Sequence, residues 1–165
     1  MSNKTESLKE KFRQALSSTA RVISDDLSVN TKKNIKNSDK QNLIELDNLN
    51  QKNDFIKARA ETDSKALKKK FSSESIFKRN LPSSSSCKSL YTITEKIRYE
   101  KLGSKMLKGI DKNLKDNYIQ MISHKRKDKI SSKDDVPVVE AFELYMLKNF
   151  HNIKLNSLTT KMLNF

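Results

Sequence analysis

Apolar side chains recur at three- and four-residue steps over much of the chain, the spacing that places them on one face of an α-helix. Near the start of the chain this repeat consists of Leu8, Phe12, Ala15, Leu16, Thr19 and Ile23. Ser7 and Glu10 have the spacing of a capping box, which predicts that the helix begins at Ser7. Asp25 and Asp26 would oppose the helix dipole, so we expect the helix to end at about Ser24.

A second helix is predicted from about Gln51 to Phe71. Its apolar stripe consists of Ile56, Ala60, Leu67 and Phe71, and Asp63 falls in line with them. Between the two helices, residues 28–42 are rich in lysine and amide side chains and have no period, which indicates a flexible connector. Residues 79–88 contain a proline and four consecutive serines, and they indicate a second flexible connector.

The longest periodic segment predicts a helix from about Ser89 to Ile122. Its first apolar face comprises Leu90, Ile93 and Ile97, and its second comprises Leu102, Met106, Ile110, Leu114 and Tyr118. The second face is displaced around the helix axis from the first. We therefore expect one long helix that contacts different neighbours along its length or that bends near Gly103.

The last predicted helix follows a charged loop over residues 124–135. Pro137 suits its start, because the N–H that proline lacks is not needed in the first turn. Its apolar face comprises Val138, Phe142, Tyr145, Met146 and Phe150. Together the helices predict a mainly α fold, a small bundle of about four helices over residues 6–150, with no assignment for the tail 151–165.

Composition supports helices and argues against two other classes of protein. The 165 residues include only two glycines and two prolines, whereas an antiparallel β protein needs turn residues at nearly every hairpin. No run approaches the roughly 18 apolar residues of a membrane span. The single cysteine, Cys87, suits a reducing compartment, and the N-terminus has no apolar signal core. We therefore expect a cytoplasmic protein.

The chain is strongly basic. Its 34 lysine and arginine residues oppose 20 acidic residues, for a net charge of +14. Such an excess is typical of proteins that bind nucleic acid, an anionic membrane surface or an acidic protein. Arginine, whose planar fork favours base and phosphate recognition, is scarce among these residues, and an AT-rich coding sequence would also enrich lysine. The charge argues only weakly for nucleic acid, and a small basic protein that binds a polyanion stays open as the alternative function.

Residues suited to catalysis or metal binding are not grouped in the sequence. Gly103 and Gly109 lack the spacing of a phosphate-binding P-loop. His124 and His151 are 27 residues apart, so a structural zinc is not expected, and both histidines are expected at the surface. Cys87 has no base nearby in the sequence and is expected to be inert. We expect this chain to hold no catalytic, cofactor-binding or metal-binding residue of its own.

Two pairs of charged residues stand out on the predicted helices. Asp63 projects into an apolar stripe, and Arg59 one turn earlier can supply the cation that a buried carboxylate needs. Glu95 and Arg98 can pair at three residues' spacing. Gly103 follows inside the same helix, where it costs about 1 kcal/mol relative to alanine, which indicates that another backbone comes close. A role within the fold and a role facing a partner both stay open for these residues.

The same segments resemble a known family. The stretch Ala58-Arg59-Ala60-Glu61-Thr62-Asp63-Ser64-Lys65-Ala66-Leu67 is similar to Ala-Arg-Gly-x-x-Asp-Ser-x-Ala-Leu in the N-terminal region of CobT, a subunit of aerobic, ATP-dependent cobaltochelatase. In the long helix the residues in register with that family are Glu95, Arg98, Glu100, Gly103, Met106, Gly109, Asn113 and Leu114. The resemblance spans roughly residues 8–150, and Ala60 replaces a family glycine. The candidate structural or partner-facing residues are Arg59, Asp63, Glu95, Arg98, Glu100, Gly103, Met106 and Asn113.

The resemblance covers only the N-terminal region of a CobT subunit. That family continues with an acidic linker and a von Willebrand A-type domain, whose Asp-x-Ser-x-Ser signature is not found in this sequence. We therefore expect a short form, a split-gene product or a remnant of the subunit.

The resemblance implies a non-catalytic assembly or coupling subunit of cobaltochelatase, a ligase that inserts cobalt into hydrogenobyrinic acid a,c-diamide during aerobic cobalamin biosynthesis. The implied partners are an AAA+ subunit and a large corrin-binding subunit. The complex would use ATP, Mg and Co, and this chain would bind none of them by itself.

Overall fold

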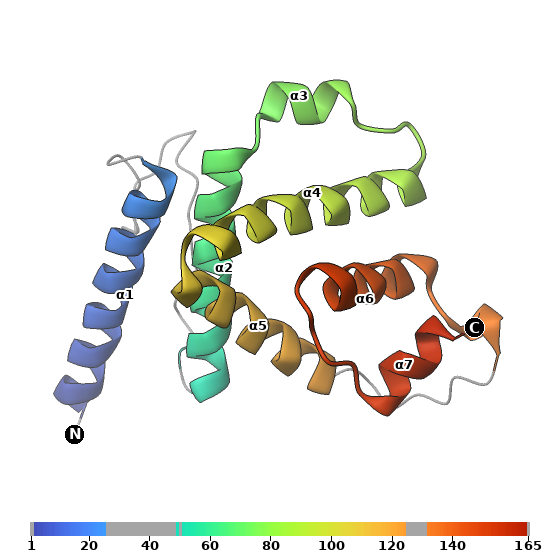
Figure 1. Cartoon of the computed structure of the whole chain (residues 1–165). Coiled ribbons are helices and arrows are strands. Elements are labelled where there is room, and N and C mark those ends of the chain that lie inside the picture. Colours follow the sequence, from blue (N-terminus) through green and yellow to red (C-terminus); the bar gives the residue numbers. More distant parts are fainter. Residues whose placement is uncertain (1, 26–48, 50, 125–131, 165) are drawn as a thin grey trace. The chain divides into compact units, whose positions relative to one another are not determined.

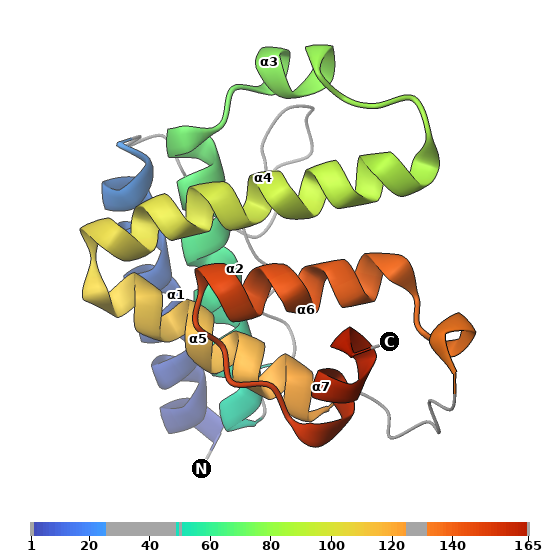
Figure 2. The same ribbon diagram turned by 45° about the vertical axis from the view of Figure 1, so that its right-hand side comes forward.

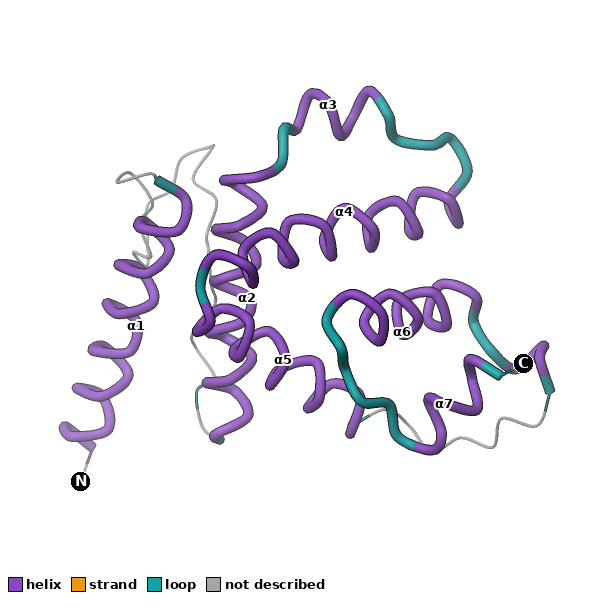
Figure 3. The backbone as a smooth tube through the Cα atoms, in the orientation of Figure 1, coloured by secondary structure: helices purple, strands orange, loops and turns teal. Residues whose placement is uncertain are grey.

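The computed structural model describes residues 2–25, 49, 51–124 and 132–164, and within them the chain is helical, with no strand (Figure 1; Figure 3). The helices are α1 (Ser2–Ser24), α2 (Lys52–Phe71), α3 (Glu74–Arg79), α4 (Ser85–Met106), α5 (Lys108–Ser123), α6 (Val138–Phe150) and α7 (Ser157–Leu163), with a short 3-10 turn at Lys133–Asp135. The predicted mainly α fold is confirmed, with more and shorter helices than the four expected. The predicted connector 28–42 lies outside the described residues.

The chain divides into two compact units, Met1–Lys70 and Phe71–Phe165. In the first unit Leu16 of α1 packs with Leu49 and Ala58, and Phe12 meets Phe55 edge-on with ring centroids 4.9 Å apart. These contacts hold α1 and α2 together through one small apolar cluster.

The sequence predicted the end of α1 and the approximate range of α2, but not the start of α1. Helix α1 ends at Ser24 as predicted, and Asp25 after it adopts a left-handed φ of 54° while its carboxylate accepts from Lys70 at 2.6 Å. The predicted start at Ser7 is wrong, because the helix begins at Ser2 and the Glu10 side chain instead accepts from Arg13 at 2.6 Å. Helix α2 spans nearly the predicted range.

In the second unit α4 is the central helix. It contacts both α5 and α6, and α7 packs against α6. Both ribbon views place α3 on the opposite side of α4 from α6 (Figure 1; Figure 2). This arrangement leaves part of α4 available to solvent beside α3.

The predicted long helix is two helices. The chain breaks at Leu107, which has an extended backbone and donates its N–H to the carbonyl of Gly103 at 3.0 Å. The second apolar stripe is divided by the break: Met106 is exposed, whereas the buried residues of α5 are Ile110, Leu114, Tyr118 and Ile122. The reversal has a physical reason, because a straight helix cannot turn two displaced apolar faces toward one core, whereas α5 folded back on α4 can.

The predicted connector 79–88 is shorter in the structure. It runs between α3 and α4 over residues 80–84, and the Ser84 hydroxyl caps α4 by accepting from the Cys87 N–H at 3.2 Å. The six-residue helix α3 had no prediction, because it is too short to present a period.

Helix α6 starts after Pro137 as predicted, but its buried face differs from the predicted one. The buried residues are Leu144, Met146 and Leu147. Val138 is 73% exposed, and Tyr145 and Phe150 are exposed as well. Its four polar residues, Glu140, Glu143, Lys148 and Asn149, are spread around the helix axis, so the sequence could not indicate which side meets the core.

The tail that had no assignment folds onto α6. Asn156 caps α7 by accepting from the Thr159 N–H at 2.8 Å, and the tail buries Ile153, Thr159 and Met162. None of the helices that the structure describes is long and apolar enough to cross a bilayer.

Candidate functional site

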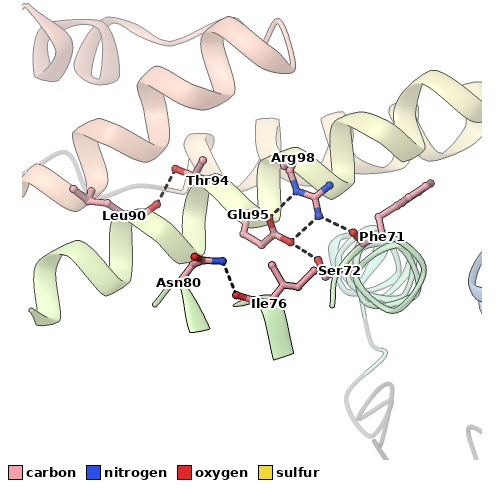
Figure 4. Close-up of polar contacts among 8 residues, drawn as sticks. All are labelled: Phe71, Ser72, Ile76, Asn80, Leu90, Thr94, Glu95 and Arg98. Atoms are coloured by element: carbon pink, nitrogen blue, oxygen red, sulfur yellow. Dashed lines mark hydrogen bonds and ion pairs between the residues drawn. The ribbon is translucent and has the colours of Figure 1, made fainter. Parts of the chain in front are cut away.

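The structure joins two of the predicted residues, Glu95 and Arg98, into one polar network on α4 (Figure 4). Arg98 donates from Nε and Nη2 to the two Glu95 carboxylate oxygens at 2.7 and 2.8 Å. Nη2 also donates to the backbone carbonyl of Phe71 at 2.6 Å, and the Ser72 hydroxyl donates to Glu95 at 2.5 Å. The network therefore fixes the chain entering α3 to the middle of α4.

The electrostatics of the pair favour the charged forms. The hydrogen bond that Arg98 donates to Glu95 raises the pKa of Arg98 above its ordinary value. The Arg98 side chain is 46% exposed and the Glu95 side chain 17%. Within the described residues Nη1 of Arg98 has no hydrogen-bond partner, so the guanidinium keeps donors for an acceptor outside this unit.

Beside the network lies a pocket of about 340 Å³ between α3 and α4. Its walls are Phe71, Ser73, Ile76, Phe77, Tyr91, Glu95 and Arg98. The ring centroids of Phe77 and Tyr91 lie 5.1 Å apart, and these two rings form the aromatic side of the pocket. A largely apolar hollow with a few polar groups at one edge can hold an apolar side chain or a small ligand.

Met106 lies two turns beyond Arg98 on the same helix and is 55% exposed. Leu102 between them is also exposed. Gly103 is buried in α4, and Asn113 is half-buried on α5. Of the predicted residues, Glu95, Arg98 and Met106 therefore share the solvent side of α4.

Glu100 lies on the opposite, buried side of α4. Tyr118 of α5 donates its hydroxyl to the Glu100 carboxylate at 2.5 Å, and Nε2 of His151 lies 3.8 Å from the same carboxylate. Burial, followed by the charge of Glu100, raises the pKa of Tyr118 well above its usual value. Burial also lowers the pKa of His151 to about 4, so its ring is neutral near pH 7. This cluster ties α4, α5 and the end of α6 together.

The expectation that His151 lies at the surface is wrong, because the residue is fully buried; His124 is exposed as expected. The spacing of His151 could have indicated its burial, since it lies one turn beyond Leu147 and continues the buried stripe of α6. Tyr118 was predicted as an apolar stripe residue, and its polar role was missed.

Arg59 and Asp63 lie in the other unit, on α2. Asp63 is fully buried, in agreement with its place in the apolar stripe. Arg59 is exposed and makes no ion pair with a described residue, so the expected Arg59–Asp63 pair does not form. Asp63 has an interaction of another kind, which does not involve Arg59.

A family model described as "Cobalamin biosynthesis protein CobT" matches residues 6–164. The chain belongs to the CobT family. Comparison with curated proteins and with solved structures returned no match. As a CobT-family protein, the chain has a role in cobalamin biosynthesis.

The CobT match includes both units and the whole of α7. It therefore extends past the resemblance to residues 8–150 and takes in the tail whose sequence carried no assignment. All the candidate residues from Arg59 to Asn113 lie inside the matched range.

The described part of this CobT-family chain presents side chains that suit contact with a partner. No group of three or more histidine, cysteine or acidic side chains within it could hold a metal ion. Cys87 is exposed in the first turn of α4. What the site offers is an aromatic pocket, a guanidinium with spare donors and exposed apolar side chains.

Proposed function

We propose that this chain is a non-catalytic assembly and coupling subunit of a cytoplasmic cobaltochelatase, acting in cobalt insertion into hydrogenobyrinic acid a,c-diamide during aerobic cobalamin biosynthesis. The observation that carries the proposal is the CobT-family match over residues 6–164. In this role an AAA+ subunit uses ATP and Mg²⁺, a large subunit holds the corrin ring and the cobalt substrate, and this chain connects the two.

The side chains on α4 support an assembly role. The solvent side of α4 carries Arg98 and Met106, which a partner can reach, while Glu100 is committed to the core through Tyr118. Binding at such a surface needs no nucleotide or metal site on this chain.

The test is association of the purified chain with the AAA+ subunit and with the large subunit in a pull-down at moderate salt. We expect the wild-type chain to bind at least one of them, and to hydrolyse no ATP and insert no cobalt alone. Arg98→Ala should weaken binding, and its melting temperature should fall modestly as well, because the substitution also removes the hydrogen bonds to Glu95 and to the Phe71 carbonyl. Glu100→Ala should lower the melting temperature, because its side chain is buried. Failure of the wild-type chain to bind either subunit would overturn the proposal.

The alternative, a small basic protein that binds a polyanion, rests on the net charge of +14. A salt titration separates the two functions. For a polyanion, the logarithm of the binding constant falls linearly with the logarithm of the salt concentration, and the slope is set by the number of phosphate contacts. Binding to a protein through apolar contacts should depend on salt much less. A steep slope with a DNA duplex, together with no subunit binding, would favour the alternative.

A further inference from the structure

One side of α4 carries a continuous stripe. Tyr91, Glu95, Arg98, Leu102 and Lys105 recur at steps of four, three, four and three residues, so they lie along one side of the helix. At 1.5 Å per residue the stripe is about 21 Å long. We call these five residues, with Met106 beside Lys105, the α4 stripe.

The two ends of the α4 stripe differ. At the N-terminal end, Tyr91 and Glu95 line the pocket that α3 completes. At the C-terminal end, Leu102 and Met106 are exposed to solvent one turn apart, with exposed Leu107 directly after them at the corner. A hollow at one end and projecting apolar side chains at the other give the stripe a shape that a second element can match.

The charge of this surface is positive. Glu95 is the stripe's only acidic residue, and its carboxylate is already engaged by Arg98 and Ser72. Lys105 and the neighbouring Lys108 are exposed and form no ion pair with a described residue. No acidic residue occurs between Glu100 and Asp111, and Asp111 is paired with Lys115 at 2.7 Å. The free donors on this side of α4 are therefore cationic.

We infer that the α4 stripe binds an acidic amphipathic helix of a partner protein. An apolar side chain of that helix would fill the pocket between α3 and α4, and others would pack on Leu102 and Met106. Its carboxylates would accept from Nη1 of Arg98 and from Lys105. The inference rests on the proposed function, because it names the surface through which the chain joins the complex.

The dimensions and chemistry favour a helix over a polyanion or a membrane surface. A stripe of about 21 Å matches about fourteen residues of a facing helix. A nucleic acid would use the lysines but gain little from exposed methionine and leucine, because its affinity comes mainly from phosphate contacts. Apolar side chains and cations at one surface instead match an apolar face flanked by carboxylates.

The experiment measures the affinity of the full chain for the purified AAA+ and large subunits, with a short DNA duplex and phosphatidylserine vesicles as competitors. Met106→Ser and Lys105→Glu should each weaken binding to the subunit about tenfold, because each removes a proposed contact at the C-terminal end of the α4 stripe. Ile119→Ser and Lys148→Glu are the matched controls. Ile119 is exposed to nearly the same extent as Met106, and both controls lie off the α4 stripe, so they should bind as the wild type does.

The outcomes separate the inference from the proposed function. Loss of affinity in both stripe variants, with unchanged melting temperatures and no effect of the controls, supports the inference. If the wild type binds a subunit and both stripe variants bind equally well, the inference falls and the proposed function stands. If only Lys105→Glu matters and the duplex or the vesicles compete, the surface binds polyanions or lipid and the inference falls. If the wild type binds neither subunit, both fall.

Discussion

At the scale of single residues, burial determines what each charged side chain of the second unit can do. Arg98 faces solvent and keeps Nη1 available as a donor, with Glu95 partly exposed beside it, whereas Glu100 is enclosed with a tyrosine and a histidine. A buried carboxylate needs its donors, because leaving it without one costs the full desolvation of the charge. The same residue type is therefore partly exposed at one position and built into the core at another.

The Tyr118 hydroxyl should contribute to stability through Glu100. Tyr118→Phe removes a donor from a buried carboxylate and should lower the free energy of unfolding by about 1–3 kcal/mol, as measured by urea denaturation. Tyr145→Phe is the control, because Tyr145 is exposed on α6 and should change the same quantity by less than about 0.5 kcal/mol. Equal effects of the two substitutions would contradict the assigned role of Tyr118.

His151 should make stability depend on pH. Its folded pKa of about 4 lies below the ordinary histidine value near 6.5, so the unfolded chain binds a proton that the folded chain does not. Stability is therefore fully present above about pH 6.5 and is lost as the pH falls toward 4, by about 3 kcal/mol in all. Burial dominates this shift; Lys101, Lys115 and Lys96 add to it and Asp111 opposes it.

Two measurements check this dependence. NMR titration of the His151 ring should give a pKa near 4, and His151→Phe should flatten the loss of stability between pH 6.5 and 4. His124→Phe is the control and should keep the wild-type pH profile, because His124 is exposed. A ring that titrates near 6.5 in the folded protein would refute the prediction.

The residue-scale features differ in how well sequence could predict them. The Glu95–Arg98 pair follows from spacing on one helix, so it could be predicted. The contacts of Glu100 with Tyr118 and His151 join residues 18 and 51 positions away, which no local pattern encodes. Arg59 shows that spacing alone is not sufficient. It lies one helical turn before Asp63, yet the two residues do not form an ion pair.

At the scale of elements, the break at Leu107 decides how the second unit is built. It ends α4 where Leu102 and Met106 face solvent and lets the apolar face of α5 return to α4. The displaced stripes indicated that the helix bends or changes neighbours along its length. Neither a proline nor a glycine occupies position 107, so the position of the break could not be predicted. The buried face of α6 could not be predicted either, because its polar residues are spread around the axis and mark no single solvent side.

Larger side chains at the two glycines that flank this break should change the stability of the fold in opposite directions. Gly103 is buried, so Gly103→Leu should destabilise by about 1–3 kcal/mol through overpacking. Gly109 is exposed in the first turn of α5 and has open space around an added Cβ, so Gly109→Ala should stabilise by about 0.5 kcal/mol. Thermal unfolding of both variants checks the pair, and a stabilised Gly103→Leu would show that position 103 has room.

At the scale of the whole molecule, helical content follows from composition and period, and it is independent of any metal. We expect a chelator to leave the far-ultraviolet circular dichroism and the melting temperature unchanged, because no ligand set that could hold a structural metal occurs in the described ranges. A chelator-dependent loss of helical signal, restored by a divalent cation, would contradict this.

The packing of the tail also has a mechanical meaning. Helix α7 packs against α6, and α6 packs against α4, the helix that carries Arg98. These packing contacts connect the tail to α4. A pull applied near Leu163 would act first on the α6–α7 joint, where Met162 and Thr159 are buried, and would reach α4 only after that joint bears the load. Because residues 151–156 also join α7 to α6 covalently, tension at this end of the unit is delivered to α6 and to its packing against α4.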